Sequence, residues 1–252
     1  TTATELQQSI LILGGGVIGC EFATIYSELG IKTTIVEMLD SLVANLDSDI
    51  SKAITKSLQQ RNVEVITGTK LETVTPGQNG VTARLSNGGS IEVEKILVAV
   101  GRKPNIENIG LEETGIKLDN GIIKVDEQCR TNVQGIYAIG DVAETRQYAH
   151  LASRMGIIAA DNAAGYEARD DRTIVPAGVY THPEAASVGL SEQQAKDKYP
   201  NVQVSRFSYS ASGMARAYDK SEGMVKLIAE KDIGAILGAV VIGSHATDVI
   251  QE

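Results

Sequence analysis

The sequence predicts an α/β fold that combines a parallel sheet, an antiparallel meander and a smaller α+β part. Three observations lead to this prediction. Short apolar runs alternate with amphipathic segments early in the chain, three turn-separated β-rich stretches follow, and closely spaced strands fill the last third. The length of 252 residues suits one large domain or two small ones, each able to bury a core.

The start of the chain alternates strands with helices. Apolar or β-branched runs predict the strands, and apolar residues at helical spacing, such as Ile18, Phe22 and Ile25, predict the helices. Gly30 is suited to end the first helix. This order is typical of a parallel sheet with right-handed crossovers. The expected elements are strand 9–13, helix 17–30, strand 33–36, helix 48–60 and strand 63–66.

An antiparallel meander is expected over residues 70–100. Its three β-rich stretches are separated by the turn segments 76–80 (PGQNG) and 87–89 (NGG), whose composition favours hairpins. The segment ends in the apolar run 95–100 (KILVAV), which we expect to rejoin the parallel sheet.

The rest of the chain begins with a turn at residues 101–105 (GRKPN). A polar stretch then precedes a buried strand expected at 136–139 and a helix expected at about 149–164. Beyond Arg172 we expect a smaller α+β part. It would contain strands at 178–180, 202–207, 224–229 and 236–242, and a helix at 191–198.

The composition excludes several classes of function. The chain has 32 acidic against 23 basic side chains, a net charge of −9, which argues against nucleic acid or an anionic membrane as the main partner. Its apolar runs are far too short to cross a bilayer, and we see no signal peptide. Cys20 and Cys129 make neither a disulfide framework nor a metal site. We therefore expect a reducing, cytoplasmic compartment and no metal.

Gly14, Gly16 and Gly19 form a G-x-G-x-x-G motif between the first strand and the first helix. Gly14 would permit a tight turn, Gly16 would let a pyrophosphate approach the backbone, and Gly19 would let helix and strand pack closely. The free N–H groups and the positive dipole end of the helix would then hold a diphosphate. A glycine-rich turn without a ligand is the alternative interpretation.

Two glutamates extend this motif. Glu37 ends the second strand, where a carboxylate can accept hydrogen bonds from both hydroxyls of an adenosine ribose and would repel a 2′-phosphate. Neither Met38 nor Leu39 supplies an Arg, so we expect NAD(H) rather than NADP(H). A solvated Glu37 is the alternative. Glu21 could contact the nicotinamide end or could pair with a Lys or Arg, and the residues leave both interpretations open.

Asp141 ends the run 135–141 (GIYAIGD), after the expected strand. Open α/β sheets bind ligands at the carboxyl ends of their strands, which makes Asp141 a candidate binding residue. From the local sequence alone, an ordinary turn or helix-capping Asp is the favoured interpretation.

Several segments, in this order, resemble flavin-dependent pyridine nucleotide–disulfide oxidoreductases. They are 14–23 (GGGVIGCEFA), 34–37 (TIVE), 100–105 (VGRKPN), 135–142 (GIYAIGDV), 180–192 (YTHPEAASVGLSE), 222–230 (EGMVKLIAE) and 236–252. The resemblance covers nearly the whole chain. Within the family the sequence is most similar to members that oxidise a protein-bound dithiol and pass the electrons through FAD to NAD+.

The resemblance implies three parts. These are a Rossmann-like NAD-binding domain with the antiparallel meander at 1–101, the returning segment of an FAD-binding domain at 102–168, and the start of an α+β dimer-interface domain at 169–252. It also implies a homodimer as the native assembly and a 2-oxo acid dehydrogenase complex as a possible partner.

The resemblance also assigns binding residues. NAD contacts are implied at Gly14, Gly15, Gly16, Val17, Ile18, Gly19, Glu21, Glu37, Leu71 and Gly101. Asp141 would contact the ribityl–phosphate region of the flavin. The pyrimidine edge of the flavin would face Gln147, Tyr148, Ala149 and His150 at a helix start, whose positive end suits the negative charge of a reduced flavin. Tyr148 stands where the family usually has Leu, but a backbone contact would tolerate the change.

Three features of the family cannot be drawn from this sequence. The family uses a C-x4-C pair near its amino end and a His–Glu pair near its carboxyl end, and the first nucleotide fingerprint, for FAD, is also missing. Cys20 and Cys129 are therefore expected to be packed residues. We expect an internal fragment of such an enzyme, itself inactive.

Three alternatives stay open. The parent could be another NADH-dependent disulfide reductase of the family, for example of the mercuric reductase type. The chain could instead be a nucleotide-binding module without catalysis. An NAD-linked dehydrogenase acting directly on an alcohol is disfavoured, because no Ser/Tyr/Lys or His constellation for proton transfer can be placed.

Overall fold

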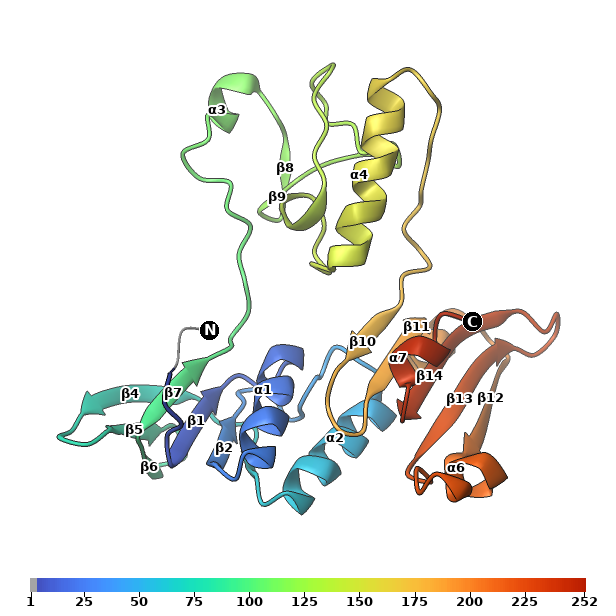
Figure 1. The fold of residues 1–252 in the computed structure, drawn as a ribbon. Coiled ribbons are helices and arrows are strands. Elements are labelled where there is room, and N and C mark those ends of the chain that lie inside the picture. Colours follow the sequence, from blue (N-terminus) through green and yellow to red (C-terminus); the bar gives the residue numbers. More distant parts are fainter. Residues whose placement is uncertain (1–3) are drawn as a thin grey trace. The chain divides into compact units, whose positions relative to one another are not determined.

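The computed structural model describes residues 4–252, and these residues fall into two compact units. The first unit combines the chain up to Gly101 with residues 176–252, and the second comprises residues 102–175 (Figure 1). The expected domain boundaries after residues 101 and 168 stay predictions. No described helix is both long and apolar enough to cross a bilayer.

A four-stranded parallel sheet forms the beginning of the first unit. Its spatial order is β3-β2-β1-β7, and every pairing is parallel. The expected parallel sheet is therefore found, with the run after the meander next to β1. The strands are β1 (Ser9–Leu13), β2 (Lys32–Val36), β3 (Glu64–Ile66) and β7 (Lys95–Val98).

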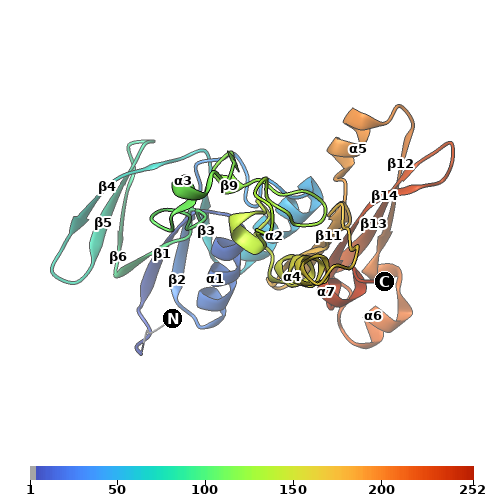
Figure 2. The same cartoon turned by 90° about the horizontal axis from the view of Figure 1, so that it is seen from above.

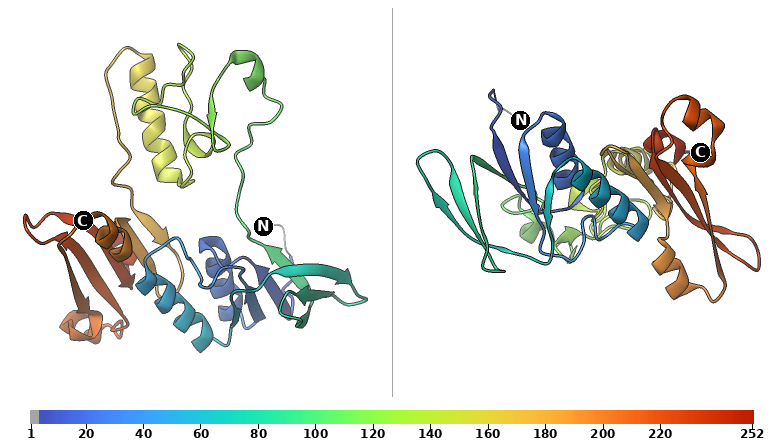
Figure 3. Two further views of the ribbon diagram at one scale, coloured as in Figure 1. Left: turned by 180° about the vertical axis from the view of Figure 1, so that it is seen from behind. Right: turned by 90° about the horizontal axis from the view of Figure 1, so that it is seen from below.

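Both faces of this sheet are covered. Ile12 and Ile35 pack against helices α1 (Val17–Glu28) and α2 (Ser48–Gln60), which lie side by side in Figure 3. Leu11 and Val36 pack instead against the antiparallel meander of β4 (Leu71–Pro76), β5 (Val81–Leu85) and β6 (Ser90–Val93). Burial on both faces explains why the run of apolar residues is nearly continuous in β1 (SILIL).

Helix α1 ends as its sequence predicts but buries a different face. The Gly30 N–H bonds Ser27 O and the Ile31 N–H bonds Tyr26 O, a Schellman ending that uses the positive φ of Gly30. The buried positions are small or polar, and Ile25 is 49% exposed. Small side chains let α1 lie close to the sheet. The buried positions are Gly19, Cys20, Ala23 and Thr24.

The end of the chain adds a five-stranded antiparallel sheet in the order β10-β11-β14-β13-β12. Its strands are β10 (Ala177–Val179), β11 (Ala185–Gly189), β12 (Val202–Ser208), β13 (Gly223–Glu230) and β14 (Ile236–Gly243). Figure 2 shows α5 (Glu192–Lys198) and α6 (Gly213–Ala217) at opposite ends of β12. The turn η2 (Tyr209–Ala211) precedes α6, and α7 (Ala246–Val249) follows β14.

Val179, Ala185, Val240 and Ile242 of this sheet belong to the same apolar core as α1 and α2. The parallel sheet, its helices and the antiparallel sheet are thus one packed body. Strand β11 was not expected, because its sequence AASVG consists mostly of small residues and has little β-branched character.

The second unit contains α3 (Leu111–Thr114), β8 (Leu118–Asp119), β9 (Ile122–Ile123), the turn η1 (Gly140–Val142) and α4 (Ala149–Ala163). Leu151 and Met155 of α4 pack with Cys129 and Ala138 in its core. The expected strand at 136–139 is wrong. This segment makes one isolated bridge, from Tyr137 to Arg130, and otherwise bonds in local turns, so it has no neighbour along which a ladder could extend.

Candidate nucleotide-binding site

The glycine turn between β1 and α1 is tightly packed on two sides. Gly14 has φ 105°, and a Cβ there would lie 2.4 Å from Ala99 O. A Cβ at Gly19 would lie 1.9 Å from Gly14 O. Any side chain at either position would push the turn away from the segment after β7 or away from α1, which gives a steric reason for both glycines.

Gly16 differs from these two because it faces open space. No atom lies within 4 Å of a Cβ built at Gly16, and no side chain caps α1 there. The Cys20 N–H is bonded to Gly16 O at 3.0 Å, and the amides before it lie in the first turn, where a helix has no acceptors of its own. An open, positive helix end with donors to spare fits the diphosphate of a dinucleotide.

The Glu37 carboxylate lies beside this turn. Its Oε2 accepts a hydrogen bond from the Gly15 N–H at 2.6 Å, and its Oε1 accepts one from the Leu39 N–H at 2.7 Å. The residue is 9% exposed. Each oxygen keeps a further lone pair, so the carboxylate can still accept hydrogen bonds from ribose hydroxyls.

Glu37 has no cation paired with it in the part of the chain that the structure describes. Among residues 4–252, no Lys, Arg or His forms an ion pair with Glu37, and the neighbouring Met38 and Leu39 are exposed and apolar. A 2′-phosphate would therefore meet a carboxylate without a neutralising cation.

Leu71 and Gly101 reach the same carboxyl edge of the parallel sheet by different routes. The segment before Leu71 is bonded to the end of β2, since the Thr69 N–H donates to Glu37 O at 3.0 Å. Ala99 comes directly after β7 and contacts the glycine turn. Gly101 lies two residues further on and has φ 113°. Val17 and Ile18 begin α1, half-buried and exposed respectively.

Glu21 has a partner that the sequence did not suggest. Its Oε1 accepts a hydrogen bond from the Tyr180 backbone N–H at 2.9 Å, just after β10. Among the residues described, Glu21 forms no ion pair with Lys or Arg, so that alternative is wrong. The nicotinamide contact stays a prediction. The partner was missed because a backbone amide 159 positions away leaves no side-chain signal.

The residues predicted to face a flavin all lie in the second unit. Asp141 is half-buried in η1, which contacts α4. Gln147 has a positive φ of 56°, Tyr148 is the N-cap residue of α4, and Ala149 and His150 open that helix. No side chain caps α4 at Tyr148. The structure thus brings the four pyrimidine-edge residues together at one helix N-terminus, with η1 packed beside it.

The ring of Tyr148 stacks on the ring of His150, with centroids 5.4 Å apart and an interplanar angle of 15°. Burial raises the pKa of Tyr148, and the positive charge of Arg146 opposes that rise. The phenol is therefore neutral near pH 7, and the side chain lies against its own helix start.

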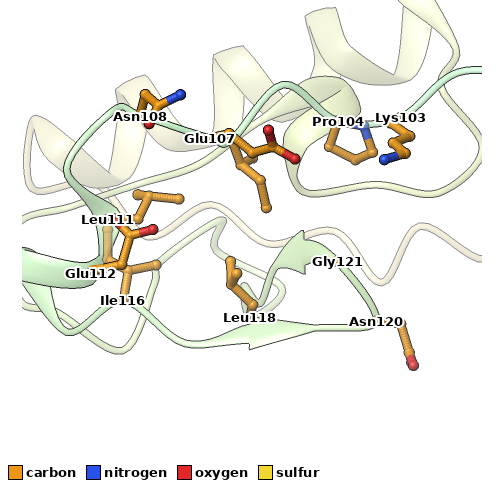
Figure 4. Close-up of a pocket in the computed structure, with 11 residues that line it drawn as sticks. Lys103, Pro104, Glu107, Asn108, Leu111, Glu112, Ile116, Leu118, Asn120 and Gly121 are labelled. Atoms are coloured by element: carbon orange, nitrogen blue, oxygen red, sulfur yellow. The ribbon is translucent and has the colours of Figure 1, made fainter.

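A hollow of about 690 Å³ lies elsewhere in the second unit (Figure 4). Its lining is mixed: Leu111, Ile116 and Leu118 are apolar, and Lys103 and Glu107 are charged. None of the predicted flavin-contacting residues lines it. The hollow is therefore separate from the predicted flavin residues.

Both cysteines are buried and reduced. Burial, followed by the negative charges of Glu21 and Glu37, raises the pKa of the Cys20 thiol to about 12, and the thiol donates to Gly15 O at 3.4 Å. Burial also raises the pKa of Cys129. Neither is a thiolate at neutral pH, which is the form that attacks a disulfide. Within residues 4–252, no cluster of three His, Cys, Asp or Glu could hold a metal ion.

Comparison with known proteins decides the family. Residues 2–156 match the model of the pyridine nucleotide-disulphide oxidoreductases, and residues 175–252 match the dimerisation domain of these proteins. The chain belongs to this family. The predicted resemblance is thereby confirmed. Proteins of this family are oxidoreductases that use FAD and NAD, as the sequence indicated.

Curated relatives include two bacterial dihydrolipoyl dehydrogenases. One, from Bacillus subtilis (strain 168), is 43% identical over 98% of this chain and 54% of its own length. Another, from Geobacillus stearothermophilus, is 40% identical over 98% of this chain and 54% of its own length. The chain thus spans about half the length of the curated relatives it matches.

Solved structures agree on the fold. LpdA from Mycobacterium tuberculosis superimposes with a TM-score of 0.91 at 28% identity, covering 99% of this chain and 55% of that one. The HOCl-induced flavoprotein disulfide reductase RclA from Escherichia coli, solved as a Cu(II) complex, gives 0.92 at 29% identity, covering 99% and 58%. The predicted mixed α/β class is confirmed.

Proposed function

We propose that this chain supplies the NAD-binding part, one segment of the FAD-binding part and the start of the dimerisation part of a dihydrolipoyl dehydrogenase. The enzyme oxidises a protein-bound dithiol to a disulfide, releasing two electrons and two protons. NAD+ accepts both electrons with one proton as a hydride, and the second proton goes to solvent. FAD, when bound, relays the electron pair between the dithiol and NAD+.

The observation that carries the proposal is the position of the Glu37 carboxylate. It is hydrogen-bonded to the glycine turn at the uncapped start of α1, so one turn presents both an anion site and a ribose acceptor. Gly14 to Gly19 would hold the diphosphate and Glu37 the adenosine ribose, with Leu71 and Gly101 flanking them. Glu21, fixed by the Tyr180 amide, would orient the nicotinamide end.

The second unit would contribute to the flavin. Asp141 would accept hydrogen bonds from the hydroxyls of the ribityl–phosphate region. The backbone N–H groups at residues 147–150 would face the pyrimidine edge, where the positive end of α4 favours the charge of a reduced flavin. Because backbone groups make this contact, Tyr148 in place of the usual Leu leaves it intact.

The match of residues 175–252 to a dimerisation domain supports a dimeric assembly. We propose a homodimer, a 2-oxo acid dehydrogenase complex as the partner that presents the dithiol, and a cytoplasmic location. The acidic net charge of −9 agrees with a small-molecule and protein partner rather than nucleic acid.

A second candidate is another NADH-dependent disulfide reductase of the family. The similarity to the RclA structures favours it, because the fold matches them as closely as it matches LpdA. In this candidate the nucleotide site is unchanged, and only the disulfide substrate differs.

The intact FAD-loaded enzyme that contains these 252 residues tests the proposal directly. Supplied with dihydrolipoamide and NAD+, it should form NADH, and with NADP+ it should form far less NADPH. An intact enzyme that binds NADH but oxidises no dihydrolipoamide would contradict the proposed activity. Reduction of another disulfide by NADH would then favour the second candidate.

A further inference from the structure

A buried lysine lies where the antiparallel sheet meets α2. The Lys226 side chain, on β13, is 0% exposed. Its ammonium group lies 2.6 Å from Asp47 Oδ1, 2.8 Å from Asp49 Oδ2 and 3.2 Å from Glu192 Oε2. An ammonium has three N–H donors, so each can reach a different carboxylate. The site for nucleotide, described above, uses none of these groups.

Further cations complete this charge cluster, which we define as Asp47, Asp49, Glu192, Lys196, Arg206 and Lys226. Arg206 Nε and Nη2 lie 3.1 and 3.0 Å from Asp49 Oδ2, and Nη2 also contacts Glu192. Lys196 Nζ lies 2.6 Å from Glu192 Oε1. Three carboxylates therefore face three cations, and each charge of the cluster has a partner of opposite sign.

The cluster joins two segments distant in sequence. Asp47 is the N-cap of α2, and its Oδ1 accepts the Asp49 N–H at 3.0 Å. Its Oδ2 accepts the Glu192 N–H at 3.0 Å, in the first turn of α5. One carboxylate thus serves the N-termini of two helices, and Lys226 holds it there from β13.

A straight row of paired residues leads from Lys226 to β10. Lys226 lies opposite Val240 of β14, Val240 opposite Ser187 of β11, and Ser187 opposite Ala177 of β10. Directly opposed residues point to one face of a sheet, so this row faces α2 with Lys226. Strand β10 ends one residue before Tyr180, whose N–H donates to Glu21.

We propose that Lys226 is a positioning residue for the nucleotide site. By fastening the antiparallel sheet to the start of α2, it holds β10 where the Tyr180 amide meets Glu21. The effect on nucleotide binding rests on the proposed function, whereas the effect on the Tyr180 amide does not.

Amide hydrogen exchange in the 252-residue chain tests this positioning. In Lys226→Met, exchange of the Tyr180 N–H should accelerate at least about tenfold more than exchange of the Ala83 N–H in the meander, which reports the general loss of stability. Lys231→Met is the matched control, because Lys231 is exposed beyond the end of β13, and it should change neither rate. An unchanged Tyr180 rate in Lys226→Met, or an equal acceleration at Ala83, would overturn the proposal.

Glu192→Gln provides a milder variant if Lys226→Met does not fold. It removes one carboxylate charge from Lys226 and should speed Tyr180 exchange a few-fold more than Ala83 exchange. No change at Tyr180 in this variant overturns the proposal as well.

An NADH titration separates the two claims. Lys226→Met should bind NADH several-fold more weakly than the wild type and Lys231→Met. A wild-type chain that binds no NADH would contradict the proposed function, and the exchange rates would still decide the role of Lys226.

Discussion

Two sets of carboxylates in the first unit, each wholly or partly buried, are held in opposite ways. Glu37 is held by two backbone N–H groups, whereas Asp47, Asp49 and Glu192 are held by the cations of the charge cluster. A carboxylate fixed by amides keeps its charge and spare lone pairs for a ligand. One surrounded by lysine and arginine has both its charge and its lone pairs used within the protein. Burial alone therefore does not mark a binding carboxylate, and the nature of its donors does.

Removing the cation from the charge cluster should have the largest effect on stability. Lys226→Met leaves three carboxylates in a site without their central ammonium, and we expect a loss of about 3–5 kcal/mol in the free energy of unfolding. Denaturant unfolding measures it. Lys231→Met should stay within about 0.5 kcal/mol of the wild type. A similarly small loss in Lys226→Met would show that the two sets of carboxylates do not differ as described.

Removing the Glu37 carboxylate should instead lower the affinity for the nucleotide. Glu37→Ala removes the acceptor for the ribose hydroxyls, and we expect NADH affinity to fall by about 2–3 kcal/mol, roughly thirty- to 150-fold. The fluorescence of NADH reports binding. Glu72→Ala, at an exposed position of β4, is the control and should leave the affinity unchanged. Equal NADH binding by Glu37→Ala and the wild type would argue against a ribose contact.

Adding one methyl group distinguishes the open side of the glycine turn, at Gly16, from its packed side, at Gly14. Gly16→Ala places it in open space at φ −70°, so the free energy of unfolding should change by less than about 0.5 kcal/mol. The same methyl would occupy the space predicted for the diphosphate and should weaken NADH binding by about tenfold, or about 1.4 kcal/mol.

Gly14→Ala is the counterpart of that variant. Its methyl would meet Ala99 O at 2.4 Å in a backbone with φ 105°, and we expect a loss of about 1–3 kcal/mol of stability. Thermal unfolding compares the two variants. If Gly16→Ala were the less stable of the two, the assignment of open and packed faces would be wrong.

The charge cluster should lose its stabilising effect only in strong acid, because the pKa values of Asp49 and Glu192 are lowered. The hydrogen bond from Lys196, together with those from Lys226 and Arg206, lowers the pKa of Glu192 to about 2 against the opposing effect of burial. Burial also opposes the lowered pKa of Asp49, which Lys226 and Arg206 produce. Because these folded-state values lie below the ordinary carboxyl pKa of about 4, their stabilisation is complete above about pH 4.

That contribution is lost as the pH falls from about 4 toward 2. Unfolding free energies measured across this range should therefore fall less steeply for Glu192→Gln than for the wild type. Parallel slopes for the two proteins would contradict the assigned pairing of Glu192.

Local signals explain what could be predicted from the sequence. The parallel sheet and the meander follow from short apolar runs and from glycine-containing turns, which act over a few residues. Glu37 could be named because its spacing from the glycine turn is itself a local pattern. Glu21 and Asp141 were also raised from the residues, while the resemblance supplied further candidates, of which Leu71 and Gly101 have no signal in their own neighbourhoods.

The charge cluster could not be predicted, because Lys226 and Asp47 are 179 positions apart and each looks like a solvated surface residue. The partner of Glu21 is a backbone amide, which no residue type reveals. The segment 136–139 is apolar enough for a strand but has no neighbour for a ladder in its unit. In each case the missing information is a long-range contact rather than a local preference.

A paired titration with NADH and NADPH tests the central claim most directly. The claim is that the Glu37 carboxylate accepts the adenosine ribose and rejects a 2′-phosphate. The 252-residue chain should bind NADH at least about tenfold more tightly than NADPH, and Glu37→Ala should abolish most of that difference. Equal affinities of the wild-type chain for the two nucleotides would contradict it.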